Sequence, residues 1–185
     1  MNKNARHDSG ASLLELMVVV LIIAITAAFS MPLLQEQVAL REIDSVARKL
    51  IAHAHLARQQ ALNLGVSVKL EPRLNGRWES GWTVSSGCIG KSNHPSCVDK
   101  VWLTQAKTDP IFFRRDGGRF IDPHTGKVGI LFNAAGAAKT THRGFVANRL
   151  VLGHHRVPGL ERHLILGSGG RWRICDPSRD AKRCH

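Results

Sequence analysis

An unbroken run of apolar residues dominates the start of the chain. From Leu13 to Leu34 the sequence reads LLELMVVVLIIAITAAFSMPLL, in which Glu15 is the only ionisable residue. A helix of these 22 residues is long enough to cross a hydrocarbon core of about 30 Å. We therefore predict a transmembrane helix over residues 11–34, preceded by a polar segment over residues 1–10.

Beyond this run, apolar residues recur every three or four positions, as they do on one face of an amphipathic helix. The members of this stripe are Val38, Ile43, Val46, Ala47, Leu50, Ile51, Ala54, Ala57, Ala61 and Leu64. Charged residues such as Arg41, Arg48 and Arg58 occupy much of the other face. Gly65 is a natural helix stop, so the pattern predicts an amphipathic helix over residues 35–64.

After Gly65 the pattern changes to short apolar or alternating segments separated by Gly, Pro, Asn and Asp, which is typical of strands and turns. The predicted strands are Val66–Leu70, Trp78–Ser85, Val101–Ala106, Ile111–Arg115, Val128–Phe132, Phe145–Leu152, His163–Leu166 and Arg171–Cys175. A long helix followed only by strands favours an α+β architecture, with the helix packed against one sheet or a two-sheet head over residues 65–185.

The residues that flank the apolar helix predict on which side of a membrane the head lies. Lys3 and Arg6 precede the helix, and positive residues before a first helix keep that end in the cytoplasm. The head then faces the periplasm, which is an oxidising compartment where disulfides form and persist.

The four cysteines form two close pairs, Cys88/Cys97 and Cys175/Cys184, with eight residues between the members of each. Zinc sites usually use pairs that are two to four residues apart. We therefore predict two disulfides, Cys88–Cys97 and Cys175–Cys184, with zinc as the alternative. This pairing rests on proximity in the sequence alone.

The chain is strongly basic, with 26 Lys and Arg against 14 Asp and Glu, a formal net charge of +12. From Lys139 to His185, ten Lys and Arg stand against Glu161, Asp176 and Asp180, so this last quarter alone carries +7. Such a charge favours an anionic partner: nucleic acid, anionic lipid or acidic polysaccharide. The alternative is that the charges only keep the protein soluble.

The segment GSGGRWRICDPSRDAKRC gathers many of these basic residues near the C-terminus. Arg171 and Arg173 alternate about Trp172, so on a strand their side chains share one face. They would lie about 6–7 Å apart, close to the spacing of successive phosphates along a DNA strand. Gly169 and Gly170 permit a tight turn and close approach of a ligand. Trp172 points either inward, as a core residue, or outward, where it could stack on a base.

A disulfide between Cys175 and Cys184 would close a loop of further basic residues beside the two arginines. Pinning that loop lowers the ordering cost of binding. The candidate DNA-binding residues are Gly170, Arg171, Trp172, Arg173, Arg179, Lys182, Arg183 and Arg162. The alternative is a set of solvated charges on an exposed tail.

The sequence contains no paired-carboxylate motif, P-loop, H-E-x-x-H or nucleophile elbow, so we expect no enzymatic activity, cofactor or metal. His53 and His55 are two residues apart and do not share a helical face, so we interpret them as surface or boundary residues. His154 and His155 precede a Pro-Gly pair, and we interpret them as surface residues rather than metal ligands.

The segment GASLLELMVVVLIIAITAAFSMP resembles the type III signal of type IV prepilins, with Gly before the cleavage site, Glu fifth after it and Pro twenty-second. Gly10, Glu15 and Pro32 match these positions. The resemblance implies that a prepilin peptidase removes the leader 1–10 by cutting between Gly10 and Ala11, and that Ala11 is then N-methylated. Ala11 departs from the Phe or Met usual in the family.

This resemblance also implies roles for the two unusual residues of the apolar helix. In a filament, the Glu15 carboxylate of one subunit can neutralise the terminal amine of its neighbour, which offsets the cost of burying either charge. Pro32 removes a backbone donor and favours a kink or local melting. The resemblance implies a single-pass inner-membrane protein, with its head in the periplasm, that assembles with other pilins into a surface filament.

The segment LARQQALNLGVSVKL resembles the FimT/GspH minor pilins, in which a helix with an A-R-x-x-A motif ends at Gly and enters a first strand. Gly170, Arg171 and Arg173 also match the G-R-x-R motif of FimT-type members. The resemblance implies a type IV pilin-like fold and sequence-independent DNA binding for uptake in natural transformation. The alternatives are a GspH-like minor pseudopilin of a type II secretion system and a minor pilin that only primes pilus assembly.

Overall fold

The computed structural model describes residues 12–74, 76–86, 100–114, 120–121, 127–139, 148–167 and 170–184. The chain forms two compact units, Met1–Val38 and Ala39–His185. Helix α1 (Leu13–Leu64) contributes to both units and runs through Pro32 without interruption. The local melting expected at Pro32 is therefore not seen.

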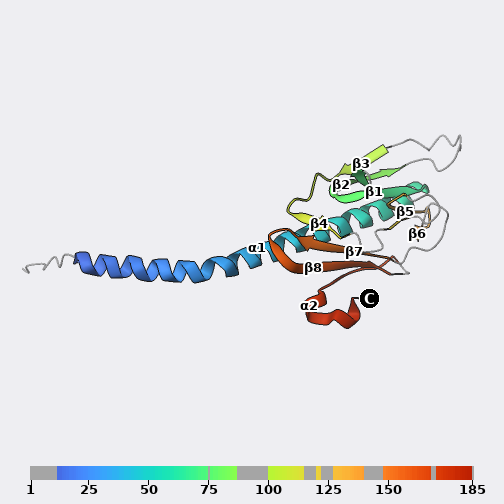
Figure 1. Ribbon diagram of the computed structural model, residues 1–185. Coiled ribbons are helices and arrows are strands. Elements are labelled where there is room, and N and C mark those ends of the chain that lie inside the picture. Colours follow the sequence, from blue (N-terminus) through green and yellow to red (C-terminus); the bar gives the residue numbers. More distant parts are fainter. Residues whose placement is uncertain are drawn as a thin grey trace, which may run out of the picture. The chain divides into compact units, whose positions relative to one another are not determined.

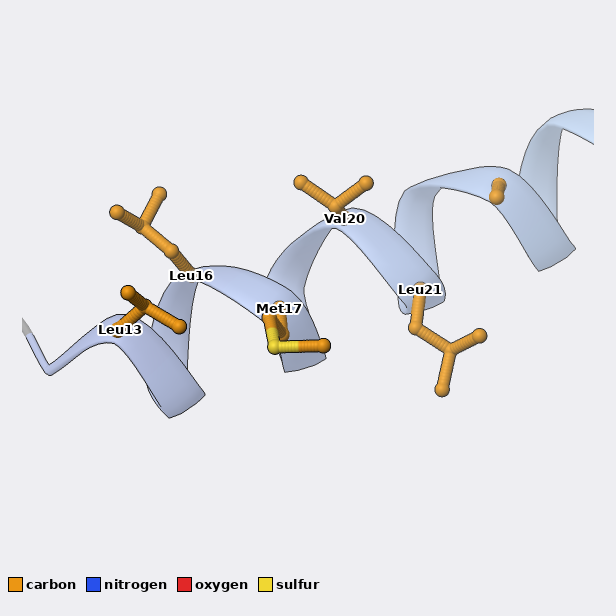
Figure 2. A pocket seen from close by; sticks show the side chains of 6 residues that line it. Leu13, Leu16, Met17, Val20 and Leu21 are labelled. Atoms are coloured by element: carbon orange, nitrogen blue, oxygen red, sulfur yellow. The ribbon is translucent and has the colours of Figure 1, made fainter.

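The first unit is an apolar helical segment whose described side chains, from Ser12 to Val38, are all exposed. Its most apolar 18-residue window has a mean hydropathy of 2.6, and α1 is the one described helix whose length and composition suit a membrane span. Figure 2 shows the start of this segment, where several apolar side chains line an open recess: Leu13, Leu16, Met17, Val20, Leu21 and Ala24.

In the second unit, one stripe of α1 is completely buried. Its members follow three- and four-residue steps and are Ala39, Ile43, Ala47, Leu50, Ala54, Ala57 and Ala61. Because most of them are alanines, the helix backbone can approach the strands closely. Val38 and Leu64, which the pattern also predicted, are exposed by 48% and 45% and lie outside the stripe.

The strands of the second unit form two sheets alongside the C-terminal half of α1 (Figure 1). Within the described ranges, one sheet has the order β3-β2-β1-β5-β6 and the other β4-β7-β8-β9, with antiparallel neighbours. The bounds are β1 Val68–Leu74, β2 Arg77–Ser86, β3 Lys100–Thr104, β4 Ile111–Phe113, β5 Ile130–Phe132, β6 Ala138–Lys139, β7 Asn148–His154, β8 Val157–Leu166 and β9 Trp172–Cys175. The predicted α+β architecture with a two-sheet head is confirmed.

Large aromatic side chains fill the core between α1 and the sheets. The rings of Trp78 and Phe120 meet edge to face at 6.5 Å, and those of Trp82 and Phe113 do the same. The Trp82 indole N–H donates to Nδ1 of His53 on α1 at 2.9 Å. Burial, followed by the charge of Lys49, lowers the pKa of His53, which favours the neutral ring that can accept this bond.

The structure adds elements that the sequence pattern did not predict. All eight predicted strands have counterparts, but β8 begins at Val157 instead of His163, and β6 was not predicted. The C-terminal tail also forms a short helix α2 (Pro177–Asp180) and a 3-10 helix η1 (Ala181–Arg183).

The interpretation of His154 as a surface residue was wrong, because His154 ends β7 and is only 3% exposed.

The alanine stripe of α1 yields a test of this packing. Ala54→Leu should lower the free energy of unfolding of the soluble head (residues 35–185) by about 1–3 kcal/mol, because the larger side chain overpacks a fully buried site. Ala52→Leu is the matched control, since Ala52 is exposed on the same helix and its change should stay within about 0.5 kcal/mol. Urea denaturation measures both, and equal values would contradict the packing.

Candidate nucleic-acid interface

The candidate site is built on the hairpin of β8 and β9. Leu166 pairs with Trp172, and β9 is the edge strand among the described strands of its sheet. The Gly167 N–H donates to the Arg171 carbonyl at 2.9 Å, and the Gly170 N–H donates to the Gly167 carbonyl at 3.0 Å. Gly170 has φ +73°, in the left-handed region that favours glycine.

Arg171, just before β9, and Arg173, on β9, are both exposed. Trp172 itself is half-buried, and its ring centroid lies 5.8 Å from that of Phe120 in the core. The inward position of Trp172 was one of the two predicted. This packing assigns Trp172 to the core rather than to a base-stacking surface.

A third arginine shares this side of the sheet, and the sequence-based set omitted it. Strand register places Arg149 on β7 opposite Ile165 on β8, and Ile165 opposite Arg173 on β9. Adjacent strands lie about 4.8 Å apart, so the backbones of the two arginines are about 10 Å apart across the sheet. Only strand pairing reveals this row, because residue 149 is far from residue 173 in the chain.

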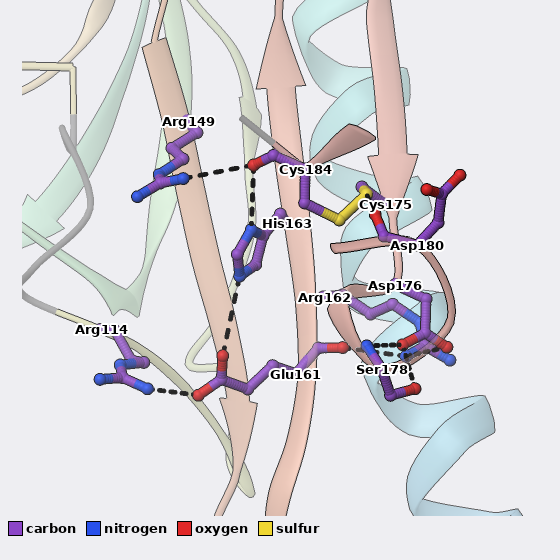
Figure 3. A network of polar contacts seen from close by, with 10 residues as sticks. All are labelled: Arg114, Arg149, Glu161, Arg162, His163, Cys175, Asp176, Ser178, Asp180 and Cys184. Atoms are coloured by element: carbon purple, nitrogen blue, oxygen red, sulfur yellow. Dashed lines mark hydrogen bonds and ion pairs between the residues drawn. A yellow bond between two sulfur atoms is a disulfide. The ribbon is translucent and has the colours of Figure 1, made fainter. Parts of the chain in front are cut away.

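The predicted Cys175–Cys184 disulfide is present, with a Cα–Cα distance of 5.5 Å. It holds the tail against β7 and β8 (Figure 3), where the Cys184 carbonyl accepts from Arg149 Nη1 at 3.2 Å. The Cys184 carbonyl also lies 3.4 Å from His163 Nδ1. The Cys88–Cys97 prediction lies outside the described residues.

The tail starts with a capped helical turn. Asp176 is the N-cap of α2, and its side chain accepts from the backbone N–H of Ser178 at 3.0 Å and from the Ser178 hydroxyl at 2.6 Å. Beyond this cap, Arg179 and Lys182 are exposed. Of Arg183 the structure describes only the backbone. The disulfide and the cap thus fix the short segment that carries these basic residues.

The assignment of Arg162 to the DNA-binding set was wrong. Arg162 is only 8% exposed, and its Nε lies 2.9 Å from Asp44 Oδ1 on α1. Its Nη1 lies 3.0 Å from Asp176 Oδ2 and donates to the Glu161 carbonyl at 2.9 Å. Arg162 therefore joins the helix, the sheet and the tail, and Figure 3 shows its contact with Asp176 of the tail.

The charge of Asp176 is held by the same contacts. Burial by itself raises the pKa of Asp176, but hydrogen bonds from Ser178 and the charges of Arg162 and Arg179 outweigh it, so the pKa is lowered overall. The carboxylate is consequently stabilised in its ionised form. Arg179 contributes from a distance of 3.7 Å with a side chain that is 85% exposed.

His154 makes structural contacts inside the head. His154 Nε2 lies 2.7 Å from Glu42 Oε2 on α1, and its Nδ1 accepts from the Arg156 N–H at 3.1 Å. These contacts suit a neutral ring that donates through Nε2. Throughout the described parts of the chain, no group of three His, Cys, Asp or Glu side chains is placed to hold a metal ion.

At the other end of the chain, Glu15 lies in the first turn of α1 and is exposed. The predicted cleavage site, Gly10 and Ala11, lies outside the described residues. The positions that processing would use are therefore known here only from the sequence.

Comparison with known proteins gives a family match and a fold match. The family model described as type II transport protein GspH matches residues 46–184. A search of curated proteins found no match.

Two solved structures share the fold of this chain. The Pseudomonas aeruginosa type IV minor pilin FimU has a TM-score of 0.53 at 13% identity, over 75% of this chain and 91% of FimU. The Vibrio cholerae minor pseudopilin EpsH has a TM-score of 0.50 at 10% identity, over 74% of this chain and 98% of EpsH. The helix and two-sheet head are thus those of a type IV pilin-like fold.

The new place of Arg162 can be tested by stability. Arg162→Met should lower the free energy of unfolding of the head by about 3 kcal/mol, because Asp44 loses the cation paired with it and Asp176 keeps only the exposed Arg179. Arg179→Met removes the same charge from a side chain that is 85% exposed, and we expect a change within about 0.5 kcal/mol. Urea denaturation distinguishes them, and a harmless Arg162→Met would refute the structural role.

Proposed function

The chain belongs to the GspH family of type II transport proteins, and from this premise we propose that it is a minor pilin that binds DNA without sequence preference for natural transformation. The family match covers nearly the whole head, and the fold is that of minor pilins and pseudopilins. Membership makes the chain a minor pilin or pseudopilin. The basic residues around the β8–β9 hairpin are the basis for proposing DNA binding.

The proposed anchor is the apolar segment of α1, held in the inner membrane with the head in the periplasm. Its exposed apolar side chains need either lipid or other helices around them. We propose that a prepilin peptidase cuts between Gly10 and Ala11 and that Glu15 pairs with the new terminus of a neighbouring pilin. A disulfide in the head agrees with an oxidising compartment.

One observation carries the DNA-binding proposal: Arg171, just before β9, and Arg173, on β9, are both exposed at the edge of the described strands of their sheet. Arg149 lies in the same row of the sheet as Arg173, and Lys182 is exposed on the tail that packs beside it. Arginine can donate two parallel hydrogen bonds to one phosphate. A cluster of such donors recognises the DNA backbone and carries no sequence preference.

The scaffold around these arginines supports binding by limiting what must be ordered. The disulfide, the α2 cap and the Arg162 ion pairs hold the tail before any ligand arrives. Trp172 fixes the start of β9 through its contact with Phe120. Preorganisation of this kind reduces the entropy lost on binding.

The proposal predicts salt-dependent DNA binding that depends on two arginines. If three phosphates are neutralised, affinity for duplex DNA should fall about 40-fold between 50 and 200 mM salt. Arg171→Ala/Arg173→Ala should weaken binding about 60-fold at 0.1 M salt, because two phosphate contacts are lost. Gel-shift titrations of the full chain in non-ionic detergent measure both effects.

The matched control is Arg41→Ala/Arg48→Ala, which removes two exposed arginines from α1 and changes the net charge equally. It should bind nearly as tightly as the wild type. Unchanged affinity in Arg171→Ala/Arg173→Ala, or equal losses in both double variants, would overturn the site.

The family description favours a second candidate, a minor pseudopilin of a type II secretion system. Deletion of the gene separates the functions, since a DNA receptor predicts loss of transformation with filaments retained. A pseudopilin predicts loss of protein secretion, and an assembly-priming pilin predicts loss of the filaments themselves. Arg171→Ala/Arg173→Ala should reproduce only the transformation defect, and a secretion defect in that variant would count against the proposal.

A further inference from the structure

Arg58 of α1 lies against the turn that presents Arg171. A Cβ added to Gly170 would sit 3.0 Å from Arg58 Nη1 and 3.5 Å from Arg58 Cζ. The guanidinium therefore rests on the glycine backbone at the start of the GRWR segment. Helix and hairpin bring together two arginines that are more than one hundred residues apart in the chain.

The environment of Arg58 differs from that of the other half-buried or buried arginines at this end of the head. Arg162 forms ion pairs with two carboxylates, and Arg149 donates a hydrogen bond to the Cys184 carbonyl. Arg58 is half-buried, yet it makes no ion pair or hydrogen bond with any residue that the structure describes. Charged groups that lose water without a partner are costly, so this guanidinium is suited to receive an anion from outside the protein.

We propose that Arg58 is a further phosphate-binding residue of the DNA surface, which then continues from β9 past Gly170 onto α1. This inference rests on the proposed function. Gly170 has two roles in it: its φ of +73° shapes the turn, and its missing side chain leaves room for the Arg58 guanidinium. The path of the DNA backbone is thereby set by a helix and a hairpin together.

The first test compares Arg58→Gln with Arg48→Gln in the full chain in non-ionic detergent, using a labelled duplex of mixed sequence. Arg48 is an exposed arginine of the same helix, about 15 Å away along its axis. Arg58→Gln should weaken binding about eightfold at 0.1 M salt and make the slope of log K against log salt less steep by about 0.9, the loss of one phosphate contact. Arg58→Lys should retain most of the slope, and Arg48→Gln all of it.

The second test uses two glycines in the left-handed region of φ, where an alanine would be strained at either position. Gly170 has φ +73° and Gly159 has φ +87°, but an added Cβ meets Arg58 only at Gly170 and open space at Gly159. Gly170→Ala should therefore weaken DNA binding while Gly159→Ala does not. In the Arg58→Gln background, Gly170→Ala should weaken DNA binding little further, because the effect of Gly170→Ala acts through Arg58.

The outcomes separate this inference from the proposed function. If Arg171→Ala/Arg173→Ala loses binding while Arg58→Gln behaves like Arg48→Gln, the Arg58 assignment is wrong and the proposed function stands. A weaker affinity for Arg58→Gln with an unchanged salt slope also overturns it, because that pattern indicates a structural role. A wild-type chain that binds no DNA refutes both.

Discussion

Arg162 forms ion pairs with two carboxylates at once, Asp44 on α1 and Asp176 at the start of the C-terminal tail. The arrangement of the basic residues on β9 and on this tail depends on it. The side chain lies almost wholly out of water, where an unpaired charge would be strongly destabilising. Helix, strand and tail must therefore keep the positions that bring both acids to it. One cation thus fixes three elements that are distant in the chain.

The remaining contacts of the tail follow from that constraint. With Asp176 held, α2 starts at a defined place, and the Cys175–Cys184 disulfide returns the tail to β9. The Cys184 carbonyl then meets Arg149 on β7. The C-terminal tail, held in place, consequently borders the outer side of the sheet next to Arg173. A site that recognises phosphates by charge and spacing alone requires such fixed positions.

Much of this could be predicted from local patterns. The alternation about Trp172 predicted that Arg171 and Arg173 share one face, because strand geometry alone decides it, and both side chains are exposed. The three- and four-residue steps predicted the buried stripe of α1, and the short spacing of Cys175 and Cys184 predicted their bond. Each of these signals lies within a few residues of chain.

What the sequence did not reveal depends on long-range contacts. Arg162 looked like one more basic residue, since its partner Asp44 is 118 positions away. The Pro-Gly pair near His154 suggested an exposed residue. The turn lies at His155–Arg156 instead, and the His154 ring is within hydrogen-bond distance of Glu42. Arg58 lies beside Gly170 only through packing, and Arg149 lies in the row of Arg173 only through strand register, for which a single sequence carries no local signal.

The distribution of acids explains why a surplus of positive charge can gather at one end of the head. Asp44 and Asp176 are committed to Arg162, while Glu161 pairs with Arg114. Because these carboxylates neutralise cations that hold the fold, none of them neutralises Arg171 or Arg58 within the described residues. The like charges that remain repel one another, and the disulfide and ion pairs offset that repulsion. A polyanion would relieve it further, which is the physical reason for the proposed DNA binding.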